Sequence, residues 1–187
     1  MKLSRLNQEM RAFFADLYEG ESKPLVLGEG QESARVALVG EAPGEQEALK
    51  GKPFVGKAGR NLDEFLRATG LDRAQLYITN VVKIRPTRVS DAGRIVNRPP
   101  TREEIELFLP WLRRELAVVK APLVVTLGNV ALKALAGRER TIGVVHGQLL
   151  SVEGMRIFPL YHPASVLYNP RLKEIYARDL AALSDFI

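Results

Sequence analysis

Four short runs of apolar residues, many of them β-branched or aromatic, predict the frame of a sheet. Each run is bounded by glycine, proline or polar residues, and none is long enough for a buried helix. Runs of this length and composition are typical of strands that are buried on both faces. The predicted strands are residues 36–39, 76–82, 122–127 and 156–161.

Between and around these runs, the apolar residues recur at helical spacing. This pattern predicts helices over residues 3–18, 58–69, 129–135 and 170–186. A capping-box sequence, Thr101-Arg102-Glu103-Glu104, predicts the start of another helix. Pro110 lies inside that helix, so we expect a kink there or a division into two short helices. Residues 87–100 are expected to form a polar loop, and residues 143–152 an edge hairpin.

Strands that alternate with helices indicate an α/β fold. The expected architecture is a three-layer α/β/α sandwich around a central, mainly parallel four-stranded sheet. The length of 187 residues fits a single domain over residues 1–187 with a substantial core.

A glycine-rich stretch follows the first predicted strand. The sequence Gly40-Glu41-Ala42-Pro43-Gly44 forces a tight turn that can bring backbone N–H groups close to a ligand. A second glycine-rich segment, residues 51–59, isolates the aromatic Phe54 between turn residues. Open α/β sheets bind ligands at the carboxyl ends of their strands, where this stretch lies.

Two further polar residues follow predicted strands and are expected at the same edge of the sheet. They are Asn80, near the end of the second strand, and His162, directly after the fourth. Taken singly, each candidate has an ordinary structural alternative. Glu41 is also explained as a solvated turn residue, Phe54 as a core side chain, and Asn80 or His162 as a capping or hydrogen-bonding residue.

Composition narrows the classes of function. The chain has no cysteine and only two histidines, which excludes disulfides, thiolate-bound zinc and cysteine-held iron–sulfur clusters. No apolar run approaches the length of a membrane helix, and the amino terminus lacks the pattern of a secretory signal. We therefore expect a cytoplasmic protein without a membrane partner, without a metal and without a cofactor.

The charge pattern permits a nucleic-acid partner. The net charge is +5 and the pI is about 9.6. Between residues 83 and 102, Asp91 is the only acid among the basic residues Lys83, Arg85, Arg88, Arg94, Arg98 and Arg102. This segment is either a solvated loop or a surface that binds phosphates.

Three familiar site motifs are absent. The glycine-rich stretch has no terminal Gly-Lys-Ser/Thr and no G-x-G-x-x-G, so it is neither a Walker motif nor a dinucleotide fingerprint. Ser165 and His162 are present without a Gly-x-Ser-x-Gly elbow, which makes a serine hydrolase a weak alternative.

Six segments in order resemble the uracil-DNA glycosylase superfamily, and most of all its fourth, thermophile-type family, which usually carries an iron–sulfur cluster. They are GEAPGEQE (40–47), GKPFVGKAGRNLDEFL (51–66), YITNVVKIRP (77–86), NRPPTREEIE (97–106), PLVVTLGNVAL (122–132) and YHPASVL (161–167). The resemblance implies a monofunctional DNA-repair hydrolase that flips uracil out of DNA and hydrolyses its N-glycosidic bond. It also implies uracil-containing DNA as the partner, and we expect a monomer.

The resemblance assigns roles in a uracil pocket. Phe54 supplies a flat apolar face for the flipped base, and Asn80 offers its amide to the O4 and N3–H edge of uracil. Backbone groups of the turn Gly40–Ala42 face the O2 oxygen, and His162 donates to that oxygen as negative charge builds on the leaving base. Catalysis is thus assigned to Asn80 and His162, and we add Glu41 as a candidate of our own.

The resemblance also implies a DNA-binding surface. The turn before the second predicted helix would bind a phosphate, and the segment after His162 would enter the minor groove as a loop, with Val166 or Leu167 as an apolar wedge. The expected DNA-binding residues are Lys57, Gly59, Arg60, Lys83, Arg85, Pro163, Ala164, Ser165, Val166 and Leu167. For Lys83, a solvated charge is the alternative.

Two departures from the superfamily pattern stand out. The best-known members read Gly-Gln-Asp-Pro-Tyr in the turn, where the Asp orients water and the Tyr excludes thymine, but this chain has Ala42 and Gly44. Glu41, the nearest acid, is our candidate for the water-orienting group. The open position at Gly44 leaves hypoxanthine or xanthine as alternative bases, and a catalytically silent DNA-binding relative is a further alternative.

The second departure concerns the cluster cysteines of the fourth family. Ile84 and Phe108 stand at the third and fourth cysteine positions, and the first pair aligns near Phe13 and Asp16. Because three of these four residues are apolar, we predict a small hydrophobic cluster in this place. His146, where relatives tend to carry arginine, is interpreted as a surface or supporting residue, and residues 89–96 as an insertion that lengthens the DNA footprint.

Overall fold

The computed structural model describes residues 2–68 and 70–187. Its main sheet has the strand order β1-β3-β2-β6-β8-β7. The strands are β1 (Glu29–Gly30), β2 (Val36–Gly40), β3 (Tyr77–Asn80), β6 (Leu123–Leu127), β7 (Leu150–Val152) and β8 (Met155–Leu160). The four inner strands are parallel, and the two edge strands pair antiparallel to them. The mainly parallel α/β fold is therefore confirmed.

The expected number of strands was too low, because the two edge strands are too short and too polar for an apolar pattern to reveal them. Strand β1 is two exposed residues that pair with β3, and β7 forms a hairpin with β8. The predicted hairpin over residues 143–152 is only partly correct. Its first half forms the short helix α6 (Ile142–Val145), and only residues 150–152 are a strand.

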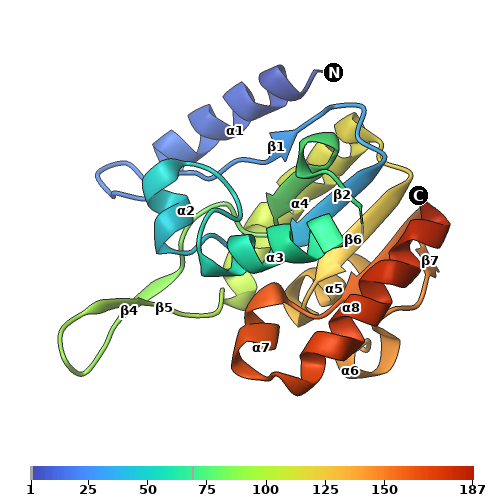
Figure 1. The fold of residues 1–187 in the computed structure, drawn as a ribbon. Helices are drawn as coiled ribbons and strands as arrows, with labels where there is room; N and C mark the ends of the chain where they lie inside the picture. The colour runs from blue at the N-terminus through green and yellow to red at the C-terminus, as the bar shows by residue number, and fades with distance from the viewer. Residues whose placement is uncertain (1, 69) are drawn as a thin grey trace.

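Helices cover both faces of the sheet (Figure 1). They are α1 (Leu3–Leu17), α2 (Glu45–Lys50), α3 (Lys57–Ala68), α4 (Arg102–Val119), α5 (Asn129–Ala136), α7 (Pro163–Tyr168) and α8 (Arg171–Leu183), with short 3₁₀ turns at Arg73–Gln75 and Ser184–Phe186. The long helices match the predicted positions. The predicted end of α3 at Thr69 falls outside the described residues.

The burial pattern of the parallel strands explains the three layers. Along β2, Ala37 and Val39 face one core with α1, α4 and α5, whereas Val36 and Leu38 face a second core with α3 and α8. Successive side chains of a strand point to opposite faces, so a strand buried on both faces reads as a continuous apolar run. The layers thus follow from the apolar runs themselves.

Helix α4 is one continuous element despite Pro110. Thr101 accepts a hydrogen bond from the backbone N–H of Glu104, and Glu104 accepts one from the backbone N–H of Thr101, which completes the predicted capping box. The expected division into two short helices is wrong. Residues Phe108, Leu112 and Leu116 bury one face of the helix, and tertiary packing of that kind overrides the cost of one lost hydrogen bond.

The segment between β3 and α4 was predicted as a polar loop, but it contains a hairpin. Strands β4 (Thr87–Val89) and β5 (Ile95–Asn97) form a separate two-stranded sheet. This hairpin projects away from the body of the molecule (Figure 1). The carboxyl ends of β2, β3, β6 and β8 lie at the same edge of the sheet as the base of the hairpin and α7, and this edge carries the candidate site.

Candidate active site

A cavity of about 430 Å³ opens at the carboxyl edge of the sheet. This size is within the range of small-ligand sites. The turn after β2, the start of α3, the end of β3, the end of β5 and the start of α7 all contribute to its wall. The lining residues are Ala42, Gly44, Glu45, Gln46, Glu47, Phe54, Gly56, Lys57, Ala58, Asn80, Asn97, His162 and Ala164.

The cavity brings together three of the residues singled out in the sequence: Phe54, Asn80 and His162. The rings of Phe54 and His162 have centroids 6.0 Å apart at an interplanar angle of 32°. Gly40 lies behind them, and a Cβ built on it would be 2.4 Å from Asn80 Oδ1 and 2.5 Å from Phe54 Cζ. Glycine is therefore required at residue 40, because any side chain there would displace both groups.

Asn80 is buried, at 2% exposure, yet its Oδ1 has no hydrogen-bond partner among the described residues. Such an unsatisfied acceptor carries a free-energy cost of about 1–3 kcal/mol. Three other buried side-chain oxygens lack a partner, in Asn7, Thr126 and Tyr176, but none of them lines this cavity. The amide of Asn80 is thus prepared for a ligand that donates a hydrogen bond.

His162 is held as a neutral donor. Its Nδ1 accepts a hydrogen bond from the backbone N–H of Ala164 at 3.1 Å, which places the single proton of the neutral ring on Nε2. Burial lowers the pKa of His162 to about 4, and the negative charge of Glu47 opposes this only in part. At neutral pH the ring therefore offers an uncharged N–H to a developing anion.

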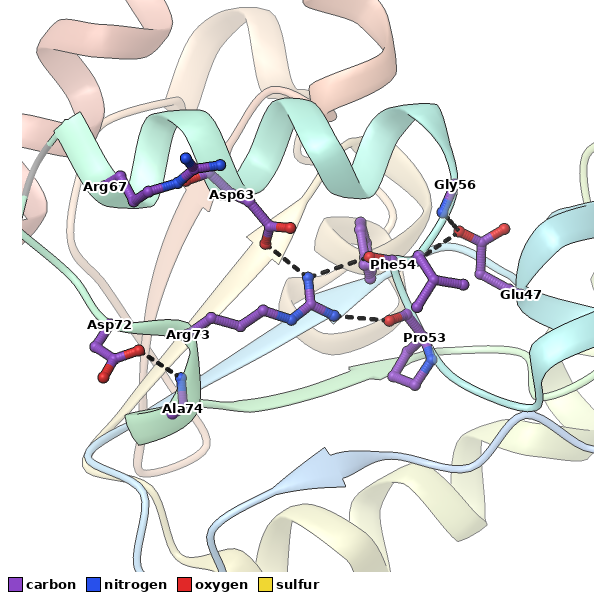
Figure 2. Close-up of polar contacts among 10 residues, drawn as sticks. Glu47, Pro53, Phe54, Gly56, Asp63, Arg67, Asp72, Arg73 and Ala74 are labelled. Atoms are coloured by element: carbon purple, nitrogen blue, oxygen red, sulfur yellow. Dashed lines mark hydrogen bonds and ion pairs between the residues drawn. The ribbon is translucent and has the colours of Figure 1, made fainter.

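Glu47 is a site residue that the sequence analysis missed. It is buried in the first helical turn after the glycine-rich stretch, and its carboxylate accepts from three backbone N–H groups. Oε1 accepts from Gly56 at 2.7 Å and from Val55 at 3.0 Å, and Oε2 accepts from Gly44 at 3.2 Å. Glu47 therefore joins the two glycine-rich turns, and Figure 2 shows its contact with the second turn at Gly56. An acid three residues after a turn glycine, at a helix N-terminus, is the signal that could have identified it.

Arg73 was also missed, because it lies in a short 3₁₀ turn far from the motifs. Its guanidinium donates to the carbonyl oxygens of Pro53 at 2.8 Å and Phe54 at 3.1 Å, and to Asp63 Oδ1 at 2.8 Å. Figure 2 shows this side chain reaching across to the Phe54 turn. Phe54 itself has a left-handed backbone with φ 53°, which is strained for a residue with a side chain. Arg73 thus holds a strained turn in place.

Glu41, the third predicted catalytic residue, lies next to the cavity rather than in its wall. It directly precedes the lining residue Ala42 without itself lining the cavity. Burial raises the pKa of the Glu41 carboxyl, and its backbone carbonyl accepts from the N–H of Val82 at 3.0 Å. A partly desolvated carboxylate next to the cavity is suited to orient or deprotonate water.

The predicted DNA-binding residues divide into exposed and buried ones. Lys57 and Arg60 are exposed at the start of α3, and Ser165 and Leu167 are exposed on α7. Ala164 lines the cavity, and Arg85 contacts two lining residues, Glu45 and Asn97. Val166 is 6% exposed and packs in the core with α3 and α8, so Leu167 is the exposed one of the two wedge candidates. The segment is a short helix rather than the expected loop, because Pro163 at its first turn favours helix initiation.

Besides Val166, three other predicted DNA contacts lie inside the protein. Pro163 is buried at the start of α7, and Gly59 is buried where a Cβ would lie 1.9 Å from the Phe54 carbonyl oxygen. Gly59 thus allows α3 to pack against the Phe54 turn. Lys83 was predicted to be a DNA contact or, alternatively, a solvated charge. Both predictions are wrong, because this side chain is 0% exposed.

Lys83 belongs to a buried polar network. Its ammonium donates to Glu115 Oε2 at 2.5 Å, to Thr79 Oγ1 at 2.5 Å and to the backbone carbonyl of Asn80 at 2.7 Å. Glu115 also accepts from the hydroxyl of Tyr77 at 2.6 Å and from Thr79. Burial lowers the pKa of Lys83, and the neighbouring carboxylate of Glu115 opposes that shift. The network thus holds Thr79 and the backbone of Asn80, at the carboxyl end of β3, in place.

Two of the four positions aligned with the family's cluster cysteines are filled by core side chains. Ile84 is 2% exposed, Phe108 is 0% exposed, and both belong to the same hydrophobic core, so the predicted apolar cluster is confirmed for these two residues and not for Phe13 and Asp16, which are exposed. Phe14 contributes the stacked ring, with its centroid 4.4 Å from that of Phe108, whereas Phe13 is 45% exposed. These residues have no chemistry for iron, and the described residues contain no group of three or more metal-ligating side chains.

A larger hollow of about 500 Å³ lies between α4 and α5. Two of its three cations are engaged in ion pairs, since Glu106 pairs with Arg102 at 2.7 Å and with Arg138 at 3.0 Å, and Lys133 is the third. Within the part of the chain that the structure describes, no buried side-chain polar atom without a partner lines it. The smaller cavity at the sheet edge is therefore the chemical site.

His146 lies outside the cavity lining and ties two elements together. Its Nδ1 is 2.6 Å from Asp179 Oδ2 on α8, and its ring lies 4.9 Å from the ring of Tyr161. The interpretation as a supporting residue agrees with this position.

The comparisons with known proteins identify the family. A family model described as the uracil DNA glycosylase superfamily matches residues 27–183. The chain belongs to this superfamily. A type-4 uracil-DNA glycosylase of Archaeoglobus fulgidus is 40% identical over 168 residues, which cover 86% of this chain and 80% of the relative. A second one, from Sulfurisphaera tokodaii, is 36% identical over 86% of this chain and 73% of its own length.

A solved structure agrees with the superfamily fold. The crystal structure of wild-type SMUG2 from Pedobacter heparinus matches with a TM-score of 0.56 at 16% identity, covering 82% of this chain and 76% of that one. At this identity the likeness concerns the fold alone. Among the described residues, no helix is both long and apolar enough to cross a membrane.

Proposed function

We propose that this protein is a monofunctional uracil-DNA glycosylase that flips uracil out of DNA and hydrolyses its N-glycosidic bond, leaving an abasic site. The superfamily match and the type-4 relatives at 36–40% identity support this function. The observation that carries it is the unpartnered amide oxygen of Asn80 inside a cavity that also holds Phe54 and His162. The proposal treats residues 1–187 as one glycosylase unit that acts as a monomer in the cytoplasm.

Asn80 provides the discrimination between bases. Its free Oδ1 accepts from N3–H of uracil, and its Nδ2 donates to O4. Cytosine presents a bare N3 and an amino group at the same positions, so it would leave the buried amide unsatisfied. A site built this way rejects the wrong base strongly, because buried polar groups are then left without partners. Phe54 supplies the apolar face on which the extruded ring stacks.

His162 provides the main electrostatic contribution to the rate. As the glycosidic bond breaks, negative charge accumulates on the uracil ring and its O2. A neutral Nε2–H that is already oriented stabilises this charge without reorganisation. Backbone N–H groups of the turn at Glu41 and Ala42 face the same oxygen.

Glu41 is the proposed water-orienting group. Its carboxylate is partly desolvated, and no hydrogen bond to it is recorded among the described residues. Glu47 is the second candidate, because it lines the cavity and its charge acts on His162. Glu47 already accepts three backbone hydrogen bonds, which favours a structural role for it. A Glu41→Gln variant should lose about 10²–10³-fold in single-turnover rate, within the range of general-base catalysis.

The proposed enzyme works without an iron–sulfur cluster. The chain has no cysteine, and Ile84 and Phe108 occupy the corresponding positions within a packed core. Detection of iron or sulfide in the purified protein, or of an absorption band near about 400 nm, would contradict this proposal.

The decisive experiment is release of free base from oligonucleotides that carry uracil, hypoxanthine, xanthine or thymine. We expect release from the uracil substrate by the wild type and strong loss in His162→Ala. Gly44 lines the cavity without a side chain, which makes hypoxanthine and xanthine the alternative substrates worth including. Tight, salt-dependent binding with no release of any base would instead identify a silent DNA-binding relative.

A further inference from the structure

The β4–β5 hairpin carries a pair of exposed apolar side chains. Val89 is 67% exposed and Ile95 is 65% exposed, and the two lie directly opposite each other across the strands. The hairpin projects from the body of the protein on the same side as α7 (Figure 1). The expectation that residues 89–96 lengthen the DNA footprint gave this apolar pair no role of its own.

The register of the hairpin places this pair on the face that continues from the cavity wall. Thr87 pairs with Asn97, and Val89 pairs with Ile95 two residues further along. Residues two apart in a strand share a face, so Asn97 and the apolar pair lie on one side of the ribbon. Asn97 also lines the cavity. Arg88 and Val96, the intervening pair, lie on the opposite face.

The hairpin is held rigidly at both ends. At its tip, the N–H of Ser90 donates to the carbonyl of Arg94 at 2.8 Å, and Gly93 takes the left-handed conformation with φ 72°. At its base, Arg98 donates to both oxygens of Glu104 at 2.7 Å and to the carbonyl of Thr87 at 3.0 Å. A rigid element presents a surface at low entropic cost when a ligand binds. Arg98 is therefore a structural residue rather than a free cation for DNA.

The charges of the hairpin favour a polyanionic partner. Arg88 and Arg94 are exposed, and no ion pair is recorded for either within residues 2–68 and 70–187. Asp91 is the only acid between residues 83 and 102. A two-stranded ribbon also fits a groove of DNA. The partner that suits this combination is the DNA substrate itself rather than another protein.

The hairpin and α7 form two rims of one cavity, since Asn97 and Ala164 both line it. On α7, Leu167 is 47% exposed and Tyr168 is 87% exposed. Both elements that contribute to the rim thus expose apolar side chains, Val89 and Ile95 on the hairpin and Leu167 and Tyr168 on α7. Extrusion unstacks the neighbouring bases and uncovers their apolar faces, which apolar side chains can cover.

We propose that the β4–β5 hairpin is a second DNA-contacting element, in which Val89 and Ile95 pack against a nucleotide that flanks the extruded one, on the side of the cavity away from α7. This inference rests on the proposed glycosylase function. A structural alternative is that the two side chains only stabilise the hairpin through their cross-strand contact. The test must therefore separate DNA contact from hairpin stability.

The test variant is Val89→Thr together with Ile95→Thr. Threonine keeps the β-branched shape and the strand preference but removes apolar surface. In single-turnover excision, we expect the half-saturating enzyme concentration on uracil-containing DNA to rise about tenfold, with the maximal rate within about twofold of wild type. Leu17→Thr is the matched control, because Leu17 is 48% exposed on α1, which contributes no residue to the cavity lining.

Truncated substrates locate the contact. Nucleotides are removed from the 5′ side or the 3′ side of the uracil, and the wild type and the double variant are compared on each substrate. Truncation on one side should remove the same contact that the double variant already lacks. The half-saturating concentration of the double variant should therefore change on truncation of the other side, but it should not change on truncation of that side. The wild type and Leu17→Thr should weaken on that side by about tenfold.

Two results would overturn the inference while leaving the glycosylase function intact. One is an unchanged half-saturating concentration for the double variant on the full-length substrate. The other is equal sensitivity of the double variant and the wild type to truncation on both sides. Failure of the wild type to release uracil from any substrate would instead refute the proposed function.

Discussion

Asn80 and Lys83 lie three residues apart at the end of β3, and both side chains are buried polar groups. Lys83 is fully partnered, by Glu115, Thr79 and the backbone of Asn80. The Oδ1 of Asn80 has no partner among the described residues. Lys83 therefore stabilises the fold, whereas Asn80 is available to bind a ligand. The sequence alone does not distinguish these two polar residues.

The two environments are connected. The ammonium of Lys83 donates to the backbone carbonyl of the residue whose amide faces the cavity. A buried network with every member satisfied is rigid, and a rigid strand end keeps the amide of Asn80 in place while its oxygen lacks a partner. The buried network of Lys83 therefore supports the position of the Asn80 amide. A mutation in the network should mainly lower stability, whereas a mutation of Asn80 should mainly lower the rate of excision.

The largest expected effect is on stability, from Lys83→Met. This change leaves Glu115 buried without its cation, so the free energy of unfolding should fall by about 3–5 kcal/mol. Urea unfolding followed by circular dichroism measures it. The double variant Lys83→Met with Glu115→Leu should recover more than half of the loss, because no charge is then left buried alone. Equal stability of the single variant and the wild type would refute the role of this network.

Asn80→Ala should show the opposite pattern. The variant removes an unsatisfied acceptor, so the free energy of unfolding should change by no more than about 1 kcal/mol. The single-turnover rate of uracil excision should fall by about 10²–10³-fold, the usual cost of losing one oriented hydrogen-bonding group at a reacting centre. A large loss of stability with little loss of rate would make Asn80 a structural residue like Lys83.

The pH dependence of stability provides a third test. The pKa of His162 is about 4 in the folded protein, below the ordinary value of 6.5. Between these values the unfolded chain binds a proton that the folded protein does not bind, so stability falls as the pH decreases through this window. From about pH 7 to about pH 5, the wild type should lose up to about 2 kcal/mol more than His162→Gln. Parallel loss in both proteins would show that His162 is not kept neutral by burial.

The smallest expected effect concerns the Phe54 turn. Arg73→Lys cannot donate to the Pro53 and Phe54 carbonyls and to Asp63 in the same fork geometry. The single-turnover rate should fall by about tenfold, because a small displacement of the stacking ring misplaces the base. Arg67→Lys on α3 is the matched control, since Arg67 contacts only the carbonyl of Asp63 in the recorded hydrogen bonds (Figure 2). Equal rates for the two variants would remove Arg73 from the site.

Sequence patterns located the cavity well but not all of its supports. Phe54, Asn80 and His162 follow predicted strands, and parallel strands end at one edge of a sheet, so their proximity could be predicted. Glu47 and Arg73 could not be identified in that way. Each acts on backbone groups of a distant turn, and neither leaves a periodic pattern in the sequence.

The sequence by itself determined the strand runs, the long helices and the parallel core, because continuous apolar runs can be buried only between two layers. It also determined that a cysteine-bound cluster is impossible. Only the tertiary structure decided that Lys83 is buried and that residues 87–97 form a hairpin. Contacts outside each segment decide these features: Glu115 on α4 compensates the charge of Lys83, and Glu104, also on α4, anchors the hairpin through Arg98. The register of that hairpin then places Val89 and Ile95 on the same face of the ribbon as Asn97, which lines the cavity.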